Sequence, residues 1–121
     1  MASTKVRTEI WASQTLTAGA GATTSAAVDL ADGYGAALNI RLTNGATGPT
    51  VAAQVRIEVS ADNSGWFDFG GALVGGKAND GIYEWGGIEI PVGVKYLRLV
   101  AGSNTDEDVD VDADIVEVTA V

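Results

Sequence analysis

The sequence predicts an all-β protein, a single antiparallel β-sandwich or jelly roll of about eight strands. Apolar and polar residues alternate with a period of two over much of the chain. Short turns rich in Gly, Asn and Asp separate the alternating runs, and no segment has the periodicity of a helix. Because the chain has only 121 residues, we expect residues 1–121 to form one domain, with residues 1–5 as an N-terminal arm.

Each expected strand is an alternating run that ends at a turn signal. The clearest is residues 51–60, where valines and an isoleucine at odd positions alternate with Gln54, Arg56 and Glu58. The full set of expected strands is residues 5–16, 25–31, 36–43, 51–60, 66–69, 81–90, 94–101 and 108–118.

Two of these strands break their own alternation. In residues 81–90, an unbroken register would place Glu84 on the same inward face as Ile88. A bulge at Gly86-Gly87 would shift the phase, bury the aromatic residues beside Glu84 and expose its carboxylate. In the last strand the apolar positions are odd as far as Ile115 and even after it, which predicts a bulge or a change of strand partner there.

The chemical repertoire of the chain is limited. It has no Cys and no His, so it lacks disulfides, thiolate metal sites and the commonest general base. Seven scattered Lys and Arg against 16 Asp and Glu give a net charge of -9, and no basic stripe is present to bind nucleic acid. We therefore expect no enzymatic activity, no cofactor, no bound metal and no nucleic-acid partner.

Nothing in the sequence predicts a membrane segment. No run approaches the 18 apolar residues of a membrane-spanning helix, and the first residues lack the apolar core of a signal peptide. We expect synthesis in the cytoplasm and no membrane partner.

Two segments resemble ligand-binding motifs and have simpler interpretations. Residues 71–78 nearly match a phosphate-binding loop, but Ala78 replaces the required Ser or Thr, which favours a glycine-rich loop between strands. Residues 106–114 are rich in Asp, but Val and Ala alternate with the acids as in a strand and unlike a calcium loop. Their carboxylates either form a solvated face that blocks edge-to-edge aggregation or pair with basic residues of a neighbour. A weak divalent-ion site is the alternative.

Acidity is concentrated in this last segment. Residues 106–117 hold seven of the 16 acids and no base, which leaves nine acids against seven bases elsewhere. We expect the aspartate face of the last strand to point to solvent or to a basic neighbour.

Three aromatic residues are candidates for contact with a partner. Trp11 falls on the same polar face of the first strand as Lys5 and Arg7, Tyr34 lies in a turn, and Trp66 opens a strand after a polar turn. Each is either a lid on the end of the sandwich or a binding hot spot. With Lys5 and Arg7, these aromatic residues form the predicted partner-contact set.

A family resemblance is found in two segments, Ile57-Glu-Val-Ser-Ala-Asp-Asn-Ser-Gly-Trp66 and Pro91-Val-Gly-Val-Lys-Tyr-Leu-Arg-Leu-Val100. They resemble the strand, turn and Trp, and the later Tyr-apolar-Arg-apolar strand, of jelly-roll modules such as discoidin-like carbohydrate- and lipid-binding domains. This chain is shorter, lacks their cysteines and has Asn63-Ser64-Gly65 where Asp-Gly is expected, so no binding residue is carried over. The short, cysteine-free chain is also similar to small β-sandwich structural proteins of tailed-phage virions, such as capsid decoration (cement) or head-fibre proteins.

The second resemblance implies a structural role in the virion. A decoration protein would bind the outer shell as a symmetric homo-oligomer and contact the major capsid protein, or other virion proteins, through its N-terminal segment and one end of the sandwich. The alternative is a carbohydrate-binding or adhesion module of a phage fibre or a cell surface.

Overall fold

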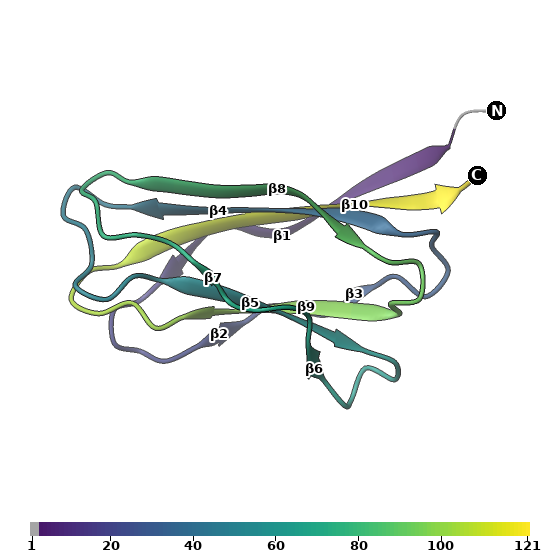
Figure 1. The fold of residues 1–121 in the computed structure, drawn as a ribbon, viewed down its shortest axis with the longest axis horizontal. Helices are drawn as coiled ribbons and strands as arrows, with labels where there is room; N and C mark the ends of the chain where they lie inside the picture. The colour runs from purple at the N-terminus through teal and green to yellow at the C-terminus, as the bar shows by residue number, and fades with distance from the viewer. Residues whose placement is uncertain (1–2) are drawn as a thin grey trace.

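The computed structural model describes residues 3–121 and is built of β-strands in two packed layers (Figure 1). Its strands are β1 (Thr4–Leu16), β2 (Thr23–Thr24), β3 (Val28–Asp29), β4 (Ala36–Asn44), β5 (Gln54–Ser60), β6 (Phe67–Asp68), β7 (Leu73–Val74), β8 (Ile82–Ile90), β9 (Tyr96–Gly102) and β10 (Val109–Ala120). The predicted all-β class is confirmed. Within residues 3–121 there is no helix long and apolar enough to cross a membrane.

The two antiparallel sheets have the strand order of a jelly roll. Sheet A has the order β1-β10-β4-β8. Sheet B has the order β2-β9-β5-β6, with β3 also pairing with β9 and β7 also pairing with β5. Because β2 and β3 share one neighbour, and β6 and β7 share another, each sheet has four strand positions, as in a double-sheet jelly roll. The ten strands therefore occupy eight positions, which matches the number of strands that the sequence predicts.

The core lies between the two sheets and is filled by the inward residue of each alternating pair. Leu38 and Leu42 of β4 face Val55 of β5 and Leu99 of β9 across the layer, and all four are fully buried. Burial of one such side chain contributes about 1.5–3 kcal/mol. Alternation in the sequence therefore translates directly into one apolar face per sheet.

The predicted bulge in β8 is confirmed. The ladder between β4 and β8 pairs Leu38 with Ile88 and Ile40 with Trp85, so Gly86 and Gly87 together oppose one residue of β4. Gly87 has φ +68°, in the left-handed region that favours glycine. As a result the side chains of Tyr83 and Trp85 turn inward, where they pack against the core, and Glu84 is exposed.

Two predicted strands and one predicted loop differ from the structure. In place of the expected strand 25–31 there are β2, which ends before residue 25, and the two-residue β3. Between them Ser25 is buried, and its hydroxyl accepts a hydrogen bond from the Leu99 amide at 2.9 Å. Strand β5 begins at Gln54, because Val51 forms only an isolated bridge with Thr105. The expected glycine-rich loop 71–78 contains β7, which pairs with β5.

The irregularity predicted at Ile115 is absent. Strand β10 pairs with β4 without a shift from Val109 to Glu117. Val116 and Val118 therefore lie on the outer face of sheet A, in line with the aspartates that precede them. The change of apolar phase in the sequence marks an apolar patch on the outer surface, with no bulge in the strand.

The start of β1 and the end of β10 extend beyond the rest of the sandwich as a two-stranded ribbon (Figure 1). Thr4 and Lys5, which belong to the expected arm, are the first residues of this ribbon, whereas residues 1–2 of that arm lie outside the described residues. Residues 4–9 are all exposed.

Candidate functional site

The outer face of sheet A carries two adjacent hollows. The first, here called the polar hollow, measures about 450 Å³, and its lining combines charged residues with Asn39, Trp11 and Trp85. The second, here called the valine hollow, measures about 560 Å³ and is lined by Val92, Val116 and Val118, with Lys5 and Tyr34 beside them. Both hollows lie on the face that points away from the core.

A row of hydrogen bonds crosses all four strands of sheet A beside the polar hollow. The guanidinium of Arg7 on β1 lies 2.8 Å from the carboxylate of Asp114 on β10. Asp114 also accepts a 2.8 Å hydrogen bond from the Asn39 side chain on β4, whose amide oxygen accepts the backbone N–H of Gly87 on β8 at 2.9 Å. The Asn39 hydrogen bond and Arg7 together hold the pKa of Asp114 below its usual value.

Aspartates in β10 and just before it bind β1 and the segment that follows β1. The carboxylate of Asp112 on β10 accepts the backbone N–H of Ser13 on β1 at 2.8 Å. That of Asp108, which precedes β10, accepts the backbone N–H of Ala18, which follows β1, at 2.8 Å. Because β10 lies between β1 and β4, the prediction that these acids block pairing at a sheet edge is wrong. The alternative, pairing with a basic neighbour, is observed once, between Asp114 and Arg7.

Among residues 3–121, no group of three or more acidic side chains is arranged to hold a metal ion. The aspartates on one face of β10 point in the same direction, but successive members are two residues apart along an extended strand, a spacing of about 6.8 Å.

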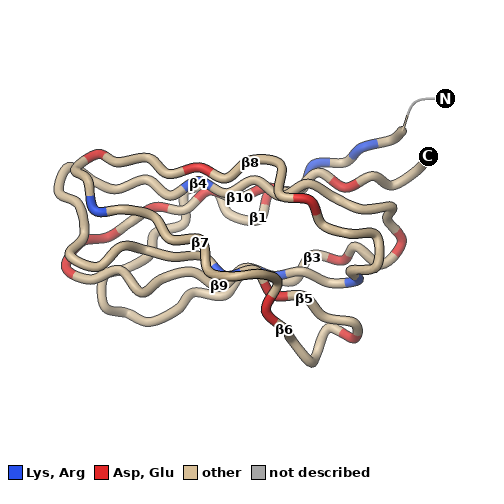
Figure 2. Tube along the Cα trace, in the orientation of Figure 1, with Lys and Arg blue, Asp and Glu red and all other residues tan. Residues whose placement is uncertain are grey.

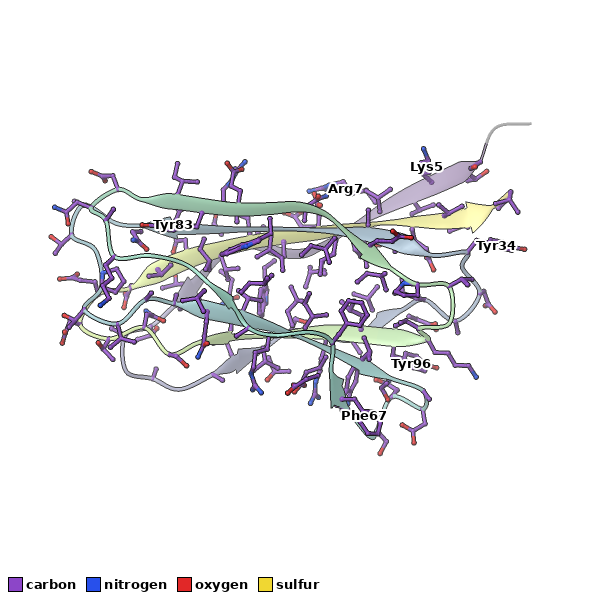
Figure 3. The ribbon with its side chains drawn as sticks, in the orientation of Figure 1. Lys5, Arg7, Tyr34, Phe67, Tyr83 and Tyr96 are labelled. Atoms are coloured by element: carbon purple, nitrogen blue, oxygen red, sulfur yellow. The ribbon has the colours of Figure 1, made fainter. Side chains whose placement is uncertain are left out.

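The valine hollow forms where the outward positions of β10 change from Asp to Val. Val116 pairs with Arg7, and Val118 pairs with Lys5, so two basic side chains lie along one side of the apolar patch. Tyr34 closes the end of the hollow, where its backbone N–H donates to the Val118 carbonyl at 2.7 Å and its side chain is 54% exposed. Figure 3 shows Lys5, Arg7 and Tyr34 at the same end of the sandwich.

Three members of the predicted contact set, Lys5, Arg7 and Tyr34, therefore lie together. Lys5 and Tyr34 line the valine hollow, and Arg7 lines the adjoining polar hollow. Figure 2 shows the two basic positions near the start of β1, in the ribbon that it forms with β10. The structure thus combines an apolar patch with positive charge at one end of an otherwise acidic molecule.

The prediction that Trp11 faces outward is wrong. In the ladder with β10, Glu9 pairs with Asp114 and Trp11 pairs with Ala113, so Ile10 is an extra residue that forms a bulge. This bulge shifts the phase of β1 and turns Trp11 toward the core, where it is 8% exposed. A side chain this buried offers little surface to a partner.

Trp66 lies just before β6 of sheet B, apart from the other candidates, and is half-buried. The Arg98 guanidinium lies over its ring at 4.2 Å from the centroid, and Arg98 also forms a 2.8 Å ion pair with Glu58. The more exposed aromatic residue here is Phe67, which is 71% exposed and projects from the lower layer (Figure 3). Nothing in the sequence around Phe67 predicts this exposure.

The sequence alone does not predict the valine hollow. Its signal is the pair of even-numbered valines that follow Asp114, which also fits a slip of the strand. Between these valines, on the opposite face of β10, burial raises the pKa of Glu117, and the negative charges of Asp29 and Asp32 raise it further. This end of the molecule thus carries one carboxylate that the folded state disfavours in its ionised form.

Comparison with known proteins places the fold among viral and bacterial β-sandwiches. No protein-family model matches this sequence, and no curated protein sequence matches it. Among solved structures, the SPBc2 prophage-derived protein YomS aligns with TM-score 0.55 and 12% identity over 96% of this chain and 96% of its own. VP2 from a subviral particle of infectious bursal disease virus aligns with TM-score 0.58 and 9% identity over 97% of this chain and 32% of that chain.

A third similar structure is a family 16 carbohydrate-binding module. It aligns with TM-score 0.50 and 10% identity over 81% of this chain and 70% of that chain. The chain spans about a third of the length of the infectious bursal disease virus protein, 32%. These likenesses show that the fold is shared with a viral particle protein, a prophage protein and a sugar-binding module.

Proposed function

We propose that this chain is a non-enzymatic structural protein of a tailed-phage virion. In this proposal it decorates the outer surface of the capsid as a symmetric homo-oligomer, contacts the major capsid protein and stabilises the shell. The contact is made by the end of the sandwich that carries the valine hollow and the ribbon of β1 and β10.

The valine hollow is the observation that carries this proposal. Val92 is 64% exposed in a polar surface, and Val116 and Val118 line the same hollow. Apolar patches of this kind on a small protein mark contact sites for other proteins, because covering them removes apolar area from water. Lys5 and Glu89 also line the hollow, so it is bordered by one charge of each sign, which can orient a partner.

Other features agree with a structural role. The sequence has neither His nor Cys, and its net charge of -9 disfavours contact with packaged DNA. The jelly-roll fold is shared with a prophage-derived protein over nearly the full length of both chains. The projecting ribbon gives the molecule an extension with which to reach a neighbouring subunit.

Co-sedimentation with purified capsid shells tests the proposal. The chain offers a matched pair of exposed valines: Val92 in the hollow, 64% exposed, and Val74 on sheet B, 55% exposed. We expect wild type and Val74→Glu to sediment with the shells equally, and Val92→Glu to bind at least about tenfold more weakly, since it places a charge in an apolar contact. Failure of the wild type to sediment, or equal loss in both variants, would contradict shell binding through this end.

The polar hollow favours a second candidate function, binding of a carbohydrate. Its lining includes Arg41 and Glu84, whose guanidinium and carboxylate can bond sugar hydroxyls. A glycan array followed by titration of tryptophan fluorescence tests this candidate. Saturable binding that is lost in Glu84→Ala and kept in Glu89→Ala would favour it, and no binding across the array would exclude it.

A further inference from the structure

Strand β1 is an exposed edge of sheet A. It pairs with β10 on one side, and no strand within residues 3–121 pairs with its other side. An open edge presents unpaired backbone N–H and C=O groups, which are a template for pairing with another strand. Residues 4–9, which form the outer part of this edge, are all exposed.

Only one part of this edge is regular enough to pair. The ladder with β10 is continuous from Lys5 to Glu9, and register shifts interrupt it on both sides of that segment. The later part of β1 contains the bulge at Ile10 and a second irregularity at Ser13, which has φ +47°. Bulges of this kind twist an edge strand away from further pairing. Pairing with another strand is therefore confined to the five residues from Lys5 to Glu9.

The charges of this segment are complementary to themselves in one register. Lys5, Arg7 and Glu9 point to the same face because they alternate along a regular strand. If a second copy pairs antiparallel with this segment so that the two Arg7 residues lie opposite each other, all five residues of the segment are paired. Lys5 of each chain then lies opposite Glu9 of the other, which gives two such pairs per dimer. Centring on Lys5 or Thr8 would leave part of the segment unpaired.

Arg7, which meets its own copy at the two-fold axis in this register, already has a counter-ion. Its guanidinium lies 2.8 Å from the Asp114 carboxylate of its own chain, so each copy brings a neutral pair to the axis. Val6, on the opposite face of the strand, is an exposed apolar side chain that would lie opposite Thr8 of the second copy.

We propose that two copies of this chain pair antiparallel through residues 5–9 of β1, around a two-fold axis at Arg7. The pairing joins the two A sheets into one sheet of eight strands and gives an isologous dimer. The pairing itself does not depend on the proposed function; only the use of the dimer as the building unit of a symmetric capsid decoration rests on it. The interface is small, so we expect a dissociation constant in the micromolar range or weaker, which avidity on a particle would strengthen.

A charge-reversal cycle tests the register. Sedimentation velocity at increasing protein concentration gives the dimer dissociation constant for wild type, Lys5→Glu, Glu9→Lys and the double variant. Each single reversal creates two like-charge pairs per dimer and is expected to weaken dimerisation about tenfold, whereas the double variant recovers the wild-type constant. These residues are exposed, and circular dichroism checks that each variant folds.

Cysteine cross-linking tests the same register independently, because the chain has no cysteine of its own. In the proposed pairing Val6 lies opposite Thr8 of the second copy, whereas the two Val6 positions are diagonal and about 7–8 Å apart, too far for a disulfide. A mixture of Val6→Cys and Thr8→Cys is expected to form a disulfide-linked dimer under mild oxidation much faster than Val6→Cys alone.

Several outcomes would overturn the pairing. The first is a wild type that stays monomeric at millimolar concentration. The second is a double variant that dimerises no more tightly than the single reversals. The third is equal rates of cross-linking for the mixture and for Val6→Cys alone. The result is separable from shell binding: a monomer that still sediments with shells refutes the pairing alone, and a dimer that does not sediment refutes the decoration role alone.

Discussion

The bulge in β8 sets the phase of the strand, and substitution of its two glycines gives a quantitative test. Gly87 has φ +68°, and a Cβ placed on it would meet no atom within 4 Å. At Gly86 the φ is outside the left-handed region, and the nearest atom to an added Cβ is the Asn39 side-chain oxygen at 3.7 Å, an ordinary contact. Neither Gly87→Ala nor Gly86→Ala therefore creates a clash, and the two differ only in backbone strain.

The expected difference follows from the two φ angles. A side chain in the left-handed region costs about 1–2 kcal/mol, which applies to Gly87→Ala alone. Both substitutions also restrict the unfolded chain, which stabilises the folded state by about 0.4–1 kcal/mol in each case. Because this second effect is common to both, we expect Gly87→Ala to be less stable than Gly86→Ala by about 1–2 kcal/mol.

Urea unfolding followed by tryptophan fluorescence measures this difference, since Trp85 lies one residue from the pair. Equal free energies of unfolding for the two variants, or a larger loss in Gly86→Ala, would refute the assignment of the bulge to Gly87. Deletion of Gly87 extends the test, because strict alternation then keeps Tyr83, Trp85 and Ile88 on the inner face and Glu84 exposed without a bulge. We expect the deletion variant to fold.

Three further predictions concern the β10 strand and the core. Asp112→Ala removes the acceptor of the Ser13 backbone N–H and should lower the free energy of unfolding in urea by about 1 kcal/mol. The control Asp110→Ala loses only the 3.3 Å contact with the Thr15 hydroxyl and should change the free energy of unfolding by less than about 0.5 kcal/mol. Glu117→Gln should raise the urea midpoint at pH 7, because the raised pKa of Glu117 means that its ionised form destabilises the folded state. The gain should vanish below about pH 4, where the carboxyl is protonated in both states. No gain at pH 7 would contradict the burial of this carboxylate. Leu99→Ala, at a fully buried position, should lower the free energy of unfolding by about 2–5 kcal/mol, and a loss under 1 kcal/mol would place Leu99 outside the core.

Much of the fold follows from the sequence because two-residue alternation reports which face of a strand is buried. The bulge in β8 was predictable, since the unbroken register would have buried Glu84 and the glycine pair offered the left-handed conformation that a bulge requires. The bulge in β1 was not, because it occurs at Ile10, with no glycine to mark it. For that reason, alternation alone places Trp11 on the wrong face.

The candidate site was predicted only in part. Lys5, Arg7 and Tyr34 lie together at one end of the sandwich, as part of the predicted contact set. The site also contains residues from later in the chain, which the sequence alone does not assign to it. The apolar members of the site, Val116 and Val118, look like core residues in the sequence. Only the uninterrupted ladder between β10 and β4 shows that they face outward.

Electron cryo-microscopy of the native particle tests the central claim most directly. The account predicts density for this jelly roll on the outside of the shell, with Val92, Val118 and the ribbon of β1 and β10 against the major capsid protein. Absence of the chain from the particle, or contact through Phe67 on sheet B with the valine hollow left open to solvent, would contradict it.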